Sequence, residues 1–240
     1  MAYNTDGFKK DLEQLHITLS EKQIEQFLTY YELLVEWNSV MNLTSIIEFD
    51  EVVKKHFVDS LSLINAVDLN REISIIDIGT GAGFPGIPLK IAFPSLNITL
   101  LDSLNKRVNF LNEVIQKLQL KDITAVHGRA EDFAKPGLLR ETFDICVSRA
   151  VANLSTLSEY CVPYVKKEGI FVSYKSERLT EELTKAKGAV FLLGGKIEDQ
   201  VEFHLPDSDI YRNLLVIRKV KNTPLKYPRK AGLPAREPLS

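Results

Sequence analysis

A glycine-dense turn after an acidic residue is the segment of this sequence with the clearest chemistry. Residues 75–86 read I-I-D-I-G-T-G-A-G-F-P-G, so an apolar run ends in Asp77 and leads into Gly79, Gly81 and Gly83. Glycines let the backbone turn tightly and approach a ligand closely. A plain connection between a strand and a helix needs fewer glycines. The segment therefore predicts a nucleotide-type cofactor site at the first strand of an open α/β sheet, bound by Asp77 and these glycines.

The same segment is compatible with two cofactors. Gly81, Gly83 and Gly86 spell G-x-G-x-x-G, and Asp102 follows about 20 residues later, as in a dinucleotide-binding fold. Asp77, however, would repel the pyrophosphate of NAD in a cleft of low dielectric constant. S-Adenosylmethionine has no phosphate and carries an ammonium and a sulfonium group, so it is favoured by a carboxylate near the turn. We predict S-adenosylmethionine, with Asp102 accepting the ribose hydroxyls, and keep an NAD-dependent reductase as the alternative.

Small and polar residues follow the predicted strands, at the edge of an open α/β sheet where ligands bind. We expect Ala130 and Glu131, after the third strand, to line the adenine pocket, because a small residue lets the ring approach. Phe84 is predicted to cover the cofactor. Arg149 ends the fourth strand and is predicted to be catalytic, meeting the methionine carboxylate or a substrate phosphate.

Other charged residues at these strand ends have alternative roles. Lys175, at the end of the fifth strand, is predicted to be a second catalytic residue that contacts the target nucleotide, although a solvated lysine at the rim gives the same pattern. Arg129 is predicted to bind RNA, and both Arg129 and Arg149 have acids nearby that would form ion pairs. His56 and His127 are isolated imidazoles that we interpret as structural, because no nucleophile and base accompany them.

Two missing motifs narrow the reaction. The fourth strand is followed by S-R-A-V at 148–151 and not by the Asn/Asp-Pro-Pro-aromatic turn that amino-group methylation of adenine requires. No Pro-Cys pair is present for methylation of a pyrimidine carbon. We therefore expect transfer to an atom that already has a usable lone pair, for which positioning and electrostatics suffice.

The composition is that of a globular protein. The chain has 240 residues, of which 45% are hydrophobic and 26% charged, and this length suits one domain of moderate size with an extension. No apolar run approaches the ~20 residues that cross a bilayer, and the N-terminus lacks a secretion pattern. Cys146 and Cys161 have neither metal-ligand nor disulfide spacing. We expect a cytoplasmic monomer that binds no metal and no membrane.

Helices and strands alternate after an N-terminal helical part. Ser20 and Gln23 form a capping box before apolar residues at helical spacing, which predicts a helix over 21–38, and residues 54–61 read as another helix. We divide the chain into a helical extension (1–70), a methyltransferase domain (71–220) and a basic extended tail (221–240). The expected strands are 73–78, 97–102, 122–126, 143–149, 168–175, 200–204 and 212–219, with helices at 85–93, 105–119, 153–165 and 177–188.

This order of elements predicts an α/β, Rossmann-like fold of the kind that S-adenosylmethionine-dependent methyltransferases use. Strands that lack apolar–polar alternation are typical of a mostly parallel sheet covered on both faces. The last two of the seven strands are joined by a connection too short for a parallel crossover. We therefore expect an antiparallel pair at one edge of the sheet.

Charge is distributed unevenly along the chain. Residues 1–70 contain no Arg and many more acidic than basic residues, whereas residues 218–240 contain a single acid, Glu237. A polyanion is therefore expected to meet one face of the protein. The prolines after Val220 predict a tail without helix. The residues predicted to bind RNA are Arg129, Lys219, Lys221, Lys226, Arg229 and Lys230.

Together these motifs resemble those of the bacterial ribosomal RNA small-subunit methyltransferase G family, also called glucose-inhibited division protein B. The glycine turn is common to many methyltransferases, whereas the other segments are specific and span nearly the whole chain. The matching segments are V-E-W-N at 35–38, N-L-T-S at 42–45, H-F-V-D-S-L at 56–61, D-I-G-T-G-A-G-F-P-G at 77–86, L-L-D-S-L-N-K-R at 100–107, G-R-A-E at 128–131, S-R-A-V at 148–151 and Y-P-R-K-A-G at 227–232.

The resemblance implies transfer of a methyl group from S-adenosylmethionine to the ring nitrogen at position seven of one guanine, in the decoding region of small-subunit (16S) ribosomal RNA. It implies that Gly79, Phe84, Ala130, Glu131 and Arg149 bind the cofactor, and that the partner is this RNA or its ribonucleoprotein particle. The guanine nitrogen has a free lone pair and loses no proton, so no dedicated base is needed. The alternatives are a methyltransferase of another RNA or of a small molecule, and a non-catalytic cofactor-binding regulator.

Overall fold

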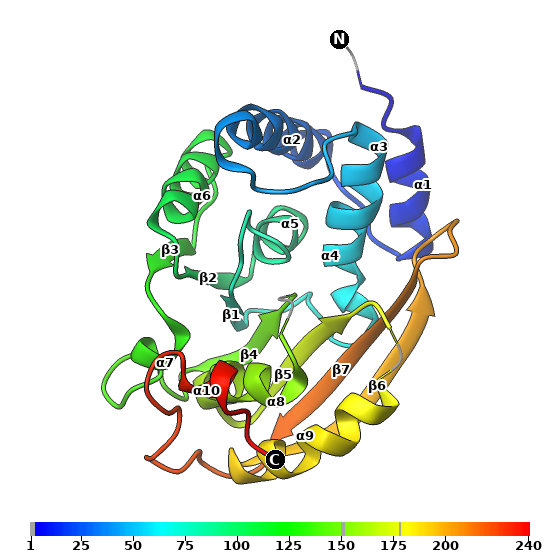
Figure 1. Cartoon of the computed structure of the whole chain (residues 1–240). Helices are drawn as coiled ribbons and strands as arrows, with labels where there is room; N and C mark the ends of the chain where they lie inside the picture. The colour runs from blue at the N-terminus through cyan, green and yellow to red at the C-terminus, as the bar shows by residue number, and fades with distance from the viewer. Residues whose placement is uncertain (1–2, 150–151, 178) are drawn as a thin grey trace.

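The protein is built around one seven-stranded sheet that crosses the middle of the molecule (Figure 1). The computed structural model describes residues 3–149, 152–177 and 179–240. The strands lie in the order β3-β2-β1-β4-β5-β7-β6. Their bounds are β1 (Ser74–Ile78), β2 (Asn97–Asp102), β3 (Ile123–His127), β4 (Phe143–Ser148), β5 (Val165–Lys175), β6 (Gly195–His204) and β7 (Tyr211–Lys219).

The sheet is parallel over its first five strands and antiparallel at one edge. Strands β1 to β5 pair in parallel, and β7 runs antiparallel to both β5 and β6. The predicted Rossmann-like fold is therefore confirmed, including its antiparallel edge. The strand order reverses between β1 and β4, and in open α/β sheets the carboxyl ends at such a point form the ligand crevice.

Helices cover both faces of the sheet, which explains why its strands do not alternate in polarity. Ile75 and Ile76 are both fully buried, but they belong to hydrophobic clusters on opposite faces. One face carries α1 (Asp6–Gln14), α2 (Glu21–Met41), α3 (Phe49–Val52), a π-helical turn (Val53–Val58), α4 (Asp59–Leu61), a 3-10 turn (Ser62–Asn65), α5 (Gly86–Ala92) and α6 (Asn105–Lys117). The other carries α7 (Ala130–Phe133), α8 (Leu154–Cys161), a 3-10 turn (Val162–Tyr164), α9 (Thr180–Leu192) and α10 (Leu233–Arg236).

The N-terminal extension shares its hydrophobic core with the sheet. Tyr30 on α2 is fully buried, and its hydroxyl donates a hydrogen bond to the carbonyl oxygen of Ala82 in the glycine turn. The predicted capping box of Ser20 and Gln23 is present, and the Gln23 side chain also donates to the carbonyl oxygen of Ile91 on α5. The N-terminal extension therefore holds the glycine turn in place through the contact between Tyr30 and Ala82.

Several element boundaries differ from the predicted ones. The helix expected over 153–165 ends at Cys161, and β5 already begins at Val165. Pro163 lies in the turn between them, where it has no N–H to continue a helix. Helix α7 has 4 residues, too few to show a helical periodicity in the sequence.

The C-terminal tail folds back onto the protein. It first crosses the amino edge of the sheet, where the Arg140 guanidinium donates hydrogen bonds to the carbonyl oxygens of Thr223 and Tyr227. It then reaches α8 and forms the one-turn helix α10 (Figure 1). The prediction of a tail without helix is therefore wrong at Leu233–Arg236. Pro234 occupies the first turn of this helix, where a missing N–H costs little.

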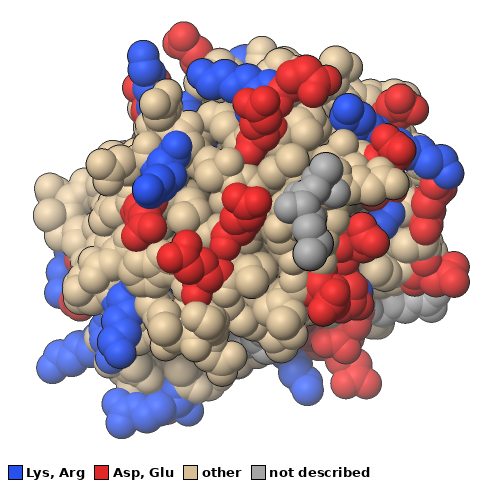
Figure 2. Space-filling model, turned by 90° about the horizontal axis from the view of Figure 1, so that it is seen from above, with Lys and Arg blue, Asp and Glu red and all other residues tan. Residues whose placement is uncertain are grey.

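The outer surface of the N-terminal helices has mixed charge. Figure 2 views the molecule from the side of these helices, and acidic and basic side chains are interspersed over the visible face. Within the described part of the chain, no helix is both long and apolar enough to span a membrane.

Candidate functional site

The glycine turn joins β1 to α5 through backbone angles that favour glycine. Gly79, Gly81 and Gly83 have φ values of 70°, 62° and 98°. A Cβ atom on Gly83 would lie 2.5 Å from Cδ1 of Ile87 and 2.9 Å from the hydroxyl of Tyr30. A side chain at this position would push the N-terminal helices away from the turn.

Asp77 lies at the end of β1, fully buried below the turn. Its Oδ2 accepts hydrogen bonds from the Thr80 hydroxyl at 2.7 Å and the Gly86 N–H at 2.9 Å, whereas Oδ1 has no hydrogen-bond partner among the described residues. Burial raises the pKa of Asp77 to about 6. A buried carboxylate oxygen without a partner is suited to a nearby cation. The contact with the ammonium group of the cofactor stays a prediction.

Asp102 holds the same turn from the neighbouring strand β2. Its Oδ2 accepts a hydrogen bond from the Gly81 N–H and its Oδ1 one from the Leu104 N–H, both at 2.9 Å. The side chain is buried, with a guanidinium nitrogen of Arg107 at 3.5 Å from Oδ2. Asp102 therefore fixes the position of the glycine turn, and the ribose contact stays a prediction.

A cavity of about 210 Å³, which we call the smaller cavity, opens beside the carboxyl ends of β1 and β2. It brings together three of the predicted cofactor residues, Gly79, Ala130 and Glu131. The Tyr164 hydroxyl donates a hydrogen bond to the carbonyl oxygen of Ala130 at 2.6 Å and so fixes this wall. The other lining residues are Ile78, Leu101, Ser103, Gly128, Arg129, Ala152, Leu157 and Tyr160. A mostly apolar lining with exposed backbone suits a flat heterocycle.

A second cavity of about 950 Å³, the larger cavity, adjoins the first. Ala152 lines both of them. Side chains enter the larger cavity from the extension, from two strand ends and from β7: Lys55, His56, Asp59, Arg149, Lys175 and Arg212. Ala150 and Val151, the rest of the S-R-A-V segment, lie outside the described residues.

Arg149 belongs to a charge network in the larger cavity. Its Nη1 donates to Oδ2 of Asp59 at 3.0 Å, and Nε of Arg212 donates to Oδ1 of the same carboxylate at 2.6 Å. Asp59 is only 3% exposed, so one buried carboxylate orients two guanidinium groups. The ion pair of Arg149 is therefore made with the N-terminal extension, and not with the acids near it in sequence.

His56 is part of this network and is not an isolated imidazole. Its ring stacks on Phe84 with 4.5 Å between centroids, and its Nδ1 lies 3.1 Å from Nη2 of Arg149. Nε2 lies 2.9 Å from the Thr44 hydroxyl. Burial and the charge of Arg149 lower the pKa of His56 to about 4, so the ring is neutral at neutral pH and can accept a hydrogen bond from Arg149.

The Phe84 side chain is buried and contacts both His56 and Arg149. Besides the stacked His56 ring, the guanidinium carbon of Arg149 lies 5.0 Å from its ring centroid, a cation–π arrangement. Phe84 therefore packs against two residues that line the larger cavity, His56 and Arg149. Its predicted contact with the cofactor is not tested by this geometry and stays a prediction.

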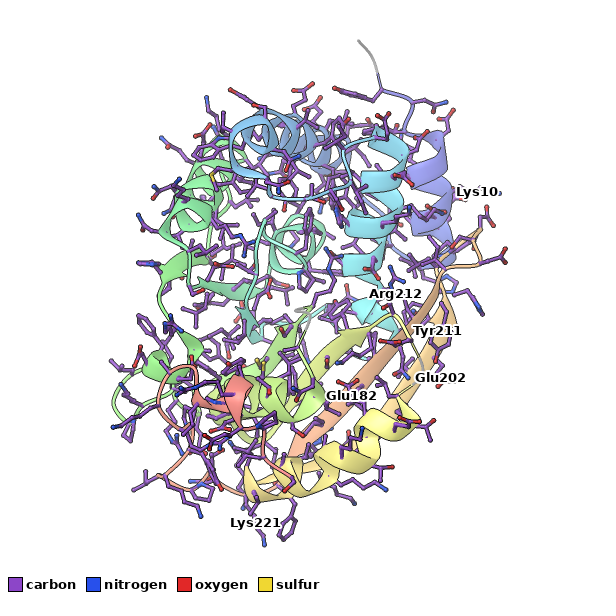
Figure 3. The ribbon with its side chains drawn as sticks, in the orientation of Figure 1. Lys10, Glu182, Glu202, Tyr211, Arg212 and Lys221 are labelled. Carbon is purple, nitrogen blue, oxygen red and sulfur yellow. The ribbon has the colours of Figure 1, made fainter. Side chains whose placement is uncertain are left out.

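Lys175 enters the larger cavity from the end of β5. Its Nζ donates to Oε1 of Glu182 at 2.8 Å and to the carbonyl oxygen of Ala152 at 3.2 Å. The side chain is only 12% exposed, so the alternative of a solvated rim lysine is not supported. Glu182 on α9 and Arg212 on β7, both labelled in Figure 3, line the same cavity.

A Rossmann-like sheet, a glycine turn and two adjoining cavities at the carboxyl edge are the features of a Rossmann-like, S-adenosylmethionine-dependent methyltransferase. Comparison with known proteins gives the family. The sequence profile described as "GidB: rRNA small subunit methyltransferase G" matches residues 23–211. The chain belongs to this family. The membership confirms the predicted class of enzyme and its methyl donor, and it excludes the alternative of an NAD-dependent reductase.

Relatives matched over nearly their whole length agree with this assignment, and a solved structure shares the fold. The chain is 57% identical to the ribosomal RNA small subunit methyltransferase G of Lachnoclostridium phytofermentans, over 97% of this chain and 96% of that protein. It is 50% identical to the protein of the same name from Lactococcus lactis subsp. cremoris, over 98% of each. Among solved structures, a SAM-dependent methyltransferase from Aquifex aeolicus superimposes with a TM-score of 0.50 at 17% identity, covering 70% of this chain and 92% of that one. This last similarity concerns the fold alone.

One predicted RNA-binding residue is misplaced. Lys219 is 1% exposed, and its Nζ donates to the carbonyl oxygen of Val162 and the hydroxyl of Thr223 and pairs with Glu141 at 3.1 Å. Burial lowers the pKa of Lys219 to about 8. The prediction that Lys219 contacts RNA is wrong, because its ammonium group is enclosed in the protein.

The remaining predicted RNA-binding residues fall into two sets. Arg229 is paired with the fully buried Glu159, with 2.7 Å between Nη2 and Oε2, so most of its hydrogen-bonding capacity is used internally. Arg129, Lys221, Lys226 and Lys230 are exposed. Lys221 lies just beyond the end of β7 opposite to Arg212, far from the larger cavity (Figure 3).

Sequence reasoning missed three residues of the larger cavity, His56, Asp59 and Arg212. His56 and Asp59 are close in sequence and lie in and directly after the π-helical turn, a form often found at functional sites. Arg212 is the second residue of β7, and nothing in the sequence distinguishes it from an ordinary strand residue. The sequence predicts a helix over the segment H-F-V-D-S-L and a structural role for His56, because nothing local indicates that the segment packs against Arg149.

Proposed function

We propose that this protein transfers a methyl group from S-adenosylmethionine to the ring nitrogen at position seven of a guanine in the decoding region of 16S ribosomal RNA. The observation that carries the proposal is the pair of adjoining cavities that share Ala152, the smaller lined by Gly79 of the glycine turn and the larger by basic residues that include Arg149, Lys175 and Arg212. A donor in the smaller cavity would point towards a nucleotide in the larger one. The names of the full-length relatives support ribosomal RNA as the substrate.

The residues of the smaller cavity fit S-adenosylmethionine, which supplies a methyl group on a sulfonium when bound. Ala130 and the backbone at Gly79 would receive the adenosine part, and Glu131 would bind at its edge. The partnerless Oδ1 of Asp77 supports an ammonium group close to the turn. Gly81, Gly83 and Phe84 shape the turn, and Asp102, which holds Gly81, would accept ribose hydroxyls with its remaining lone pairs.

The residues of the larger cavity fit a phosphate-linked base. Arg149, Arg212 and Lys175 place three cations around the cavity, and the first two are fixed in orientation by Asp59. Such groups bind phosphate and stabilise charge that moves during transfer. The guanine nitrogen attacks with its own lone pair and loses no proton. This agrees with His56, which stays neutral and engaged with Arg149 and Thr44.

The partner that we propose is small-subunit ribosomal RNA or its ribonucleoprotein particle, met by the protein as a monomer in the cytoplasm. A paired guanine must be unstacked to reach the larger cavity, at a cost of roughly a few kcal/mol that is smaller in a loop. Arg129 and Lys230 are exposed cations that would contact phosphates around the entrance. Lys226 is also exposed, but it lies at the amino edge, between the two residues whose carbonyl oxygens bind Arg140.

The test is to map methylated bases in ribosomal RNA from cells with and without this protein. We expect one position-seven methylguanine in the small-subunit RNA to disappear with the gene and to return when purified protein and S-adenosylmethionine are added to unmethylated particles. If the methylation pattern does not change and the protein still binds S-adenosylmethionine, the non-catalytic regulator is the better interpretation. A loss in another RNA would assign another substrate.

A further inference from the structure

The end of the tail is anchored to both α7 and α8. Arg229 pairs with Glu159 on α8, the Gly232 N–H donates a hydrogen bond to Oε1 of Glu131 on α7 at 2.8 Å, and the Thr156 hydroxyl on α8 donates to the carbonyl oxygen of Pro234 at 2.9 Å. We call residues 229–234 the strap. Figure 1 shows α10, which begins within the strap, lying over α8 and beside α7.

The anchor at Glu159 is strong and specific. Glu159 is fully buried, and it accepts hydrogen bonds from the backbone N–H of Arg229 at 2.8 Å and from the guanidinium nitrogens Nε and Nη2. A buried carboxylate that lost these donors would be left without compensation. This pairing explains why a basic residue of the tail is directed inwards, and it fixes where the strap crosses α8.

The anchors coincide with the walls of the smaller cavity. Glu131 itself lines this cavity, and it is only 6% exposed. On α8, the lining residues Leu157 and Tyr160 each directly follow an anchor residue, Thr156 and Glu159. Helix α7 has only 4 residues, too short to be held by its own backbone hydrogen bonds. The strap therefore adds a second link between these two walls, besides the hydrogen bond from Tyr164 to Ala130.

We propose that the strap positions Glu131 and α8 for binding of S-adenosylmethionine, with Gly232 and Arg229 as positioning residues. This inference rests on the proposed function, in that it takes the smaller cavity as the cofactor pocket. It assigns Arg229 and Gly232, in the end of the basic tail, to the cofactor site, and of the basic residues of the strap it leaves only the exposed Lys230 for RNA contact.

The test is a double-mutant cycle on the full-length chain, measuring the dissociation constant of S-adenosylmethionine by calorimetry. Gly232→Pro removes the N–H that binds Glu131 and cannot adopt the φ of 82°, so it also displaces the backbone of the strap at this point. Gly232→Ala is the milder control, because it keeps the N–H and adds a methyl group into open space, at the cost of a strained φ. We expect Gly232→Pro to weaken binding at least roughly 3- to 10-fold, the usual cost of one lost hydrogen bond, and Gly232→Ala to weaken it much less. In a Glu131→Ala background, Gly232→Pro should have no further effect.

Three results would overturn the inference. Equal affinities of Gly232→Pro and Gly232→Ala would show that the strap does not act on the pocket. A lowered melting temperature with an unchanged dissociation constant would assign it a purely structural role. A Glu131→Ala protein with normal affinity would overturn the placement of the cofactor itself, which distinguishes that failure from failure of the strap alone.

If Gly232→Pro does not fold, Arg229→Lys provides the same test. It keeps a positive charge beside Glu159 but loses the planar fork of the guanidinium group. Arg236→Lys, the same substitution at an exposed position of α10, is its charge-matched control. Weaker cofactor binding by Arg229→Lys and normal binding by Arg236→Lys support the strap, and equal binding by both overturns it.

Discussion

The strand ends and the basic tail are the two regions for which the sequence predicts ligand contacts, and they differ in where their charges lie. Arg149 and Lys175 at the strand ends are paired with Asp59 and Glu182, but both line one cavity together with residues from distant parts of the chain. In the tail region, Lys219 is buried and Arg229 is paired with a buried acid, and neither lines the smaller or the larger cavity. The topology of a parallel sheet tells where residues meet, whereas the sign of a charge does not tell whether the protein has already neutralised it.

The largest effect is expected at the strand ends, for Arg149. Losing a guanidinium group that stabilises the reacting charges should cost on the order of 2–4 kcal/mol of transition-state stabilisation, a rate loss of roughly 30- to 1,000-fold in Arg149→Ala. Arg149→Lys should recover only part of the rate, because a point charge cannot hold Asp59 and His56 with one planar fork. Single-turnover methyl transfer to small-subunit particles measures this. Near-normal rates in both variants would make Arg149 a structural partner of Asp59.

The fold could be predicted much more completely than the site. Apolar runs separated by glycine and helical periods identify the strands of a parallel sheet, and each strand end then places its own residues at one edge, as for Ala130 and Lys175. Asp59 could not be found in this way. Its role depends on packing of the extension against Arg149 and Arg212, a contact between segments about 90 and 150 residues apart. No local pattern encodes a long-range contact of this kind.

The next largest effect is expected in the tail region, on the stability of the protein. Lys219→Met keeps the apolar stem of Lys219 but leaves the carbonyl oxygen of Val162 and the carboxylate of Glu141 without this donor. The free energy of unfolding should fall by about 2–4 kcal/mol. Lys221→Met, two residues further on and exposed, should change it by less than about 0.5 kcal/mol. Urea denaturation measures both. Similar stabilities would mean that the buried lysine is dispensable and that its internal contacts add little to the stability of the fold.

At the strand ends, the pH dependence of cofactor affinity should report on Asp77. Its pKa in the free protein is about 6, so below pH 6 the carboxyl group is protonated and must lose its proton to bind a cation. Affinity for S-adenosylmethionine should therefore fall by up to about tenfold per pH unit below pH 6 and be constant above about pH 7. His56, with a pKa of about 4, does not titrate in this range.

The control for this dependence is Asp77→Asn, which keeps an acceptor for the Thr80 hydroxyl and the Gly86 N–H. Calorimetry between pH 5 and pH 8 should give a flat profile for this variant, with weaker binding at the upper end. An identical pH profile in both proteins would show that another group titrates, and the electrostatic argument for S-adenosylmethionine at Asp77 would lose its basis.

The smallest effect separates two exposed lysines within the tail itself. Lys230 lies two residues before Gly232, beside the wall of the smaller cavity, whereas Lys221 lies at the opposite edge of the sheet. If RNA enters at the carboxyl edge, only Lys230 is near its phosphates. The slope of log affinity for small-subunit RNA against log salt should then decrease by roughly 0.7–0.9 in Lys230→Ala, the value for one phosphate contact, and stay unchanged in Lys221→Ala. Because both variants lose one exposed positive charge, a difference between them reports on position and not on net charge. Equal slopes in the two variants would mean that the tail attracts RNA only through its overall charge, and the carboxyl edge would lose its special place in RNA binding.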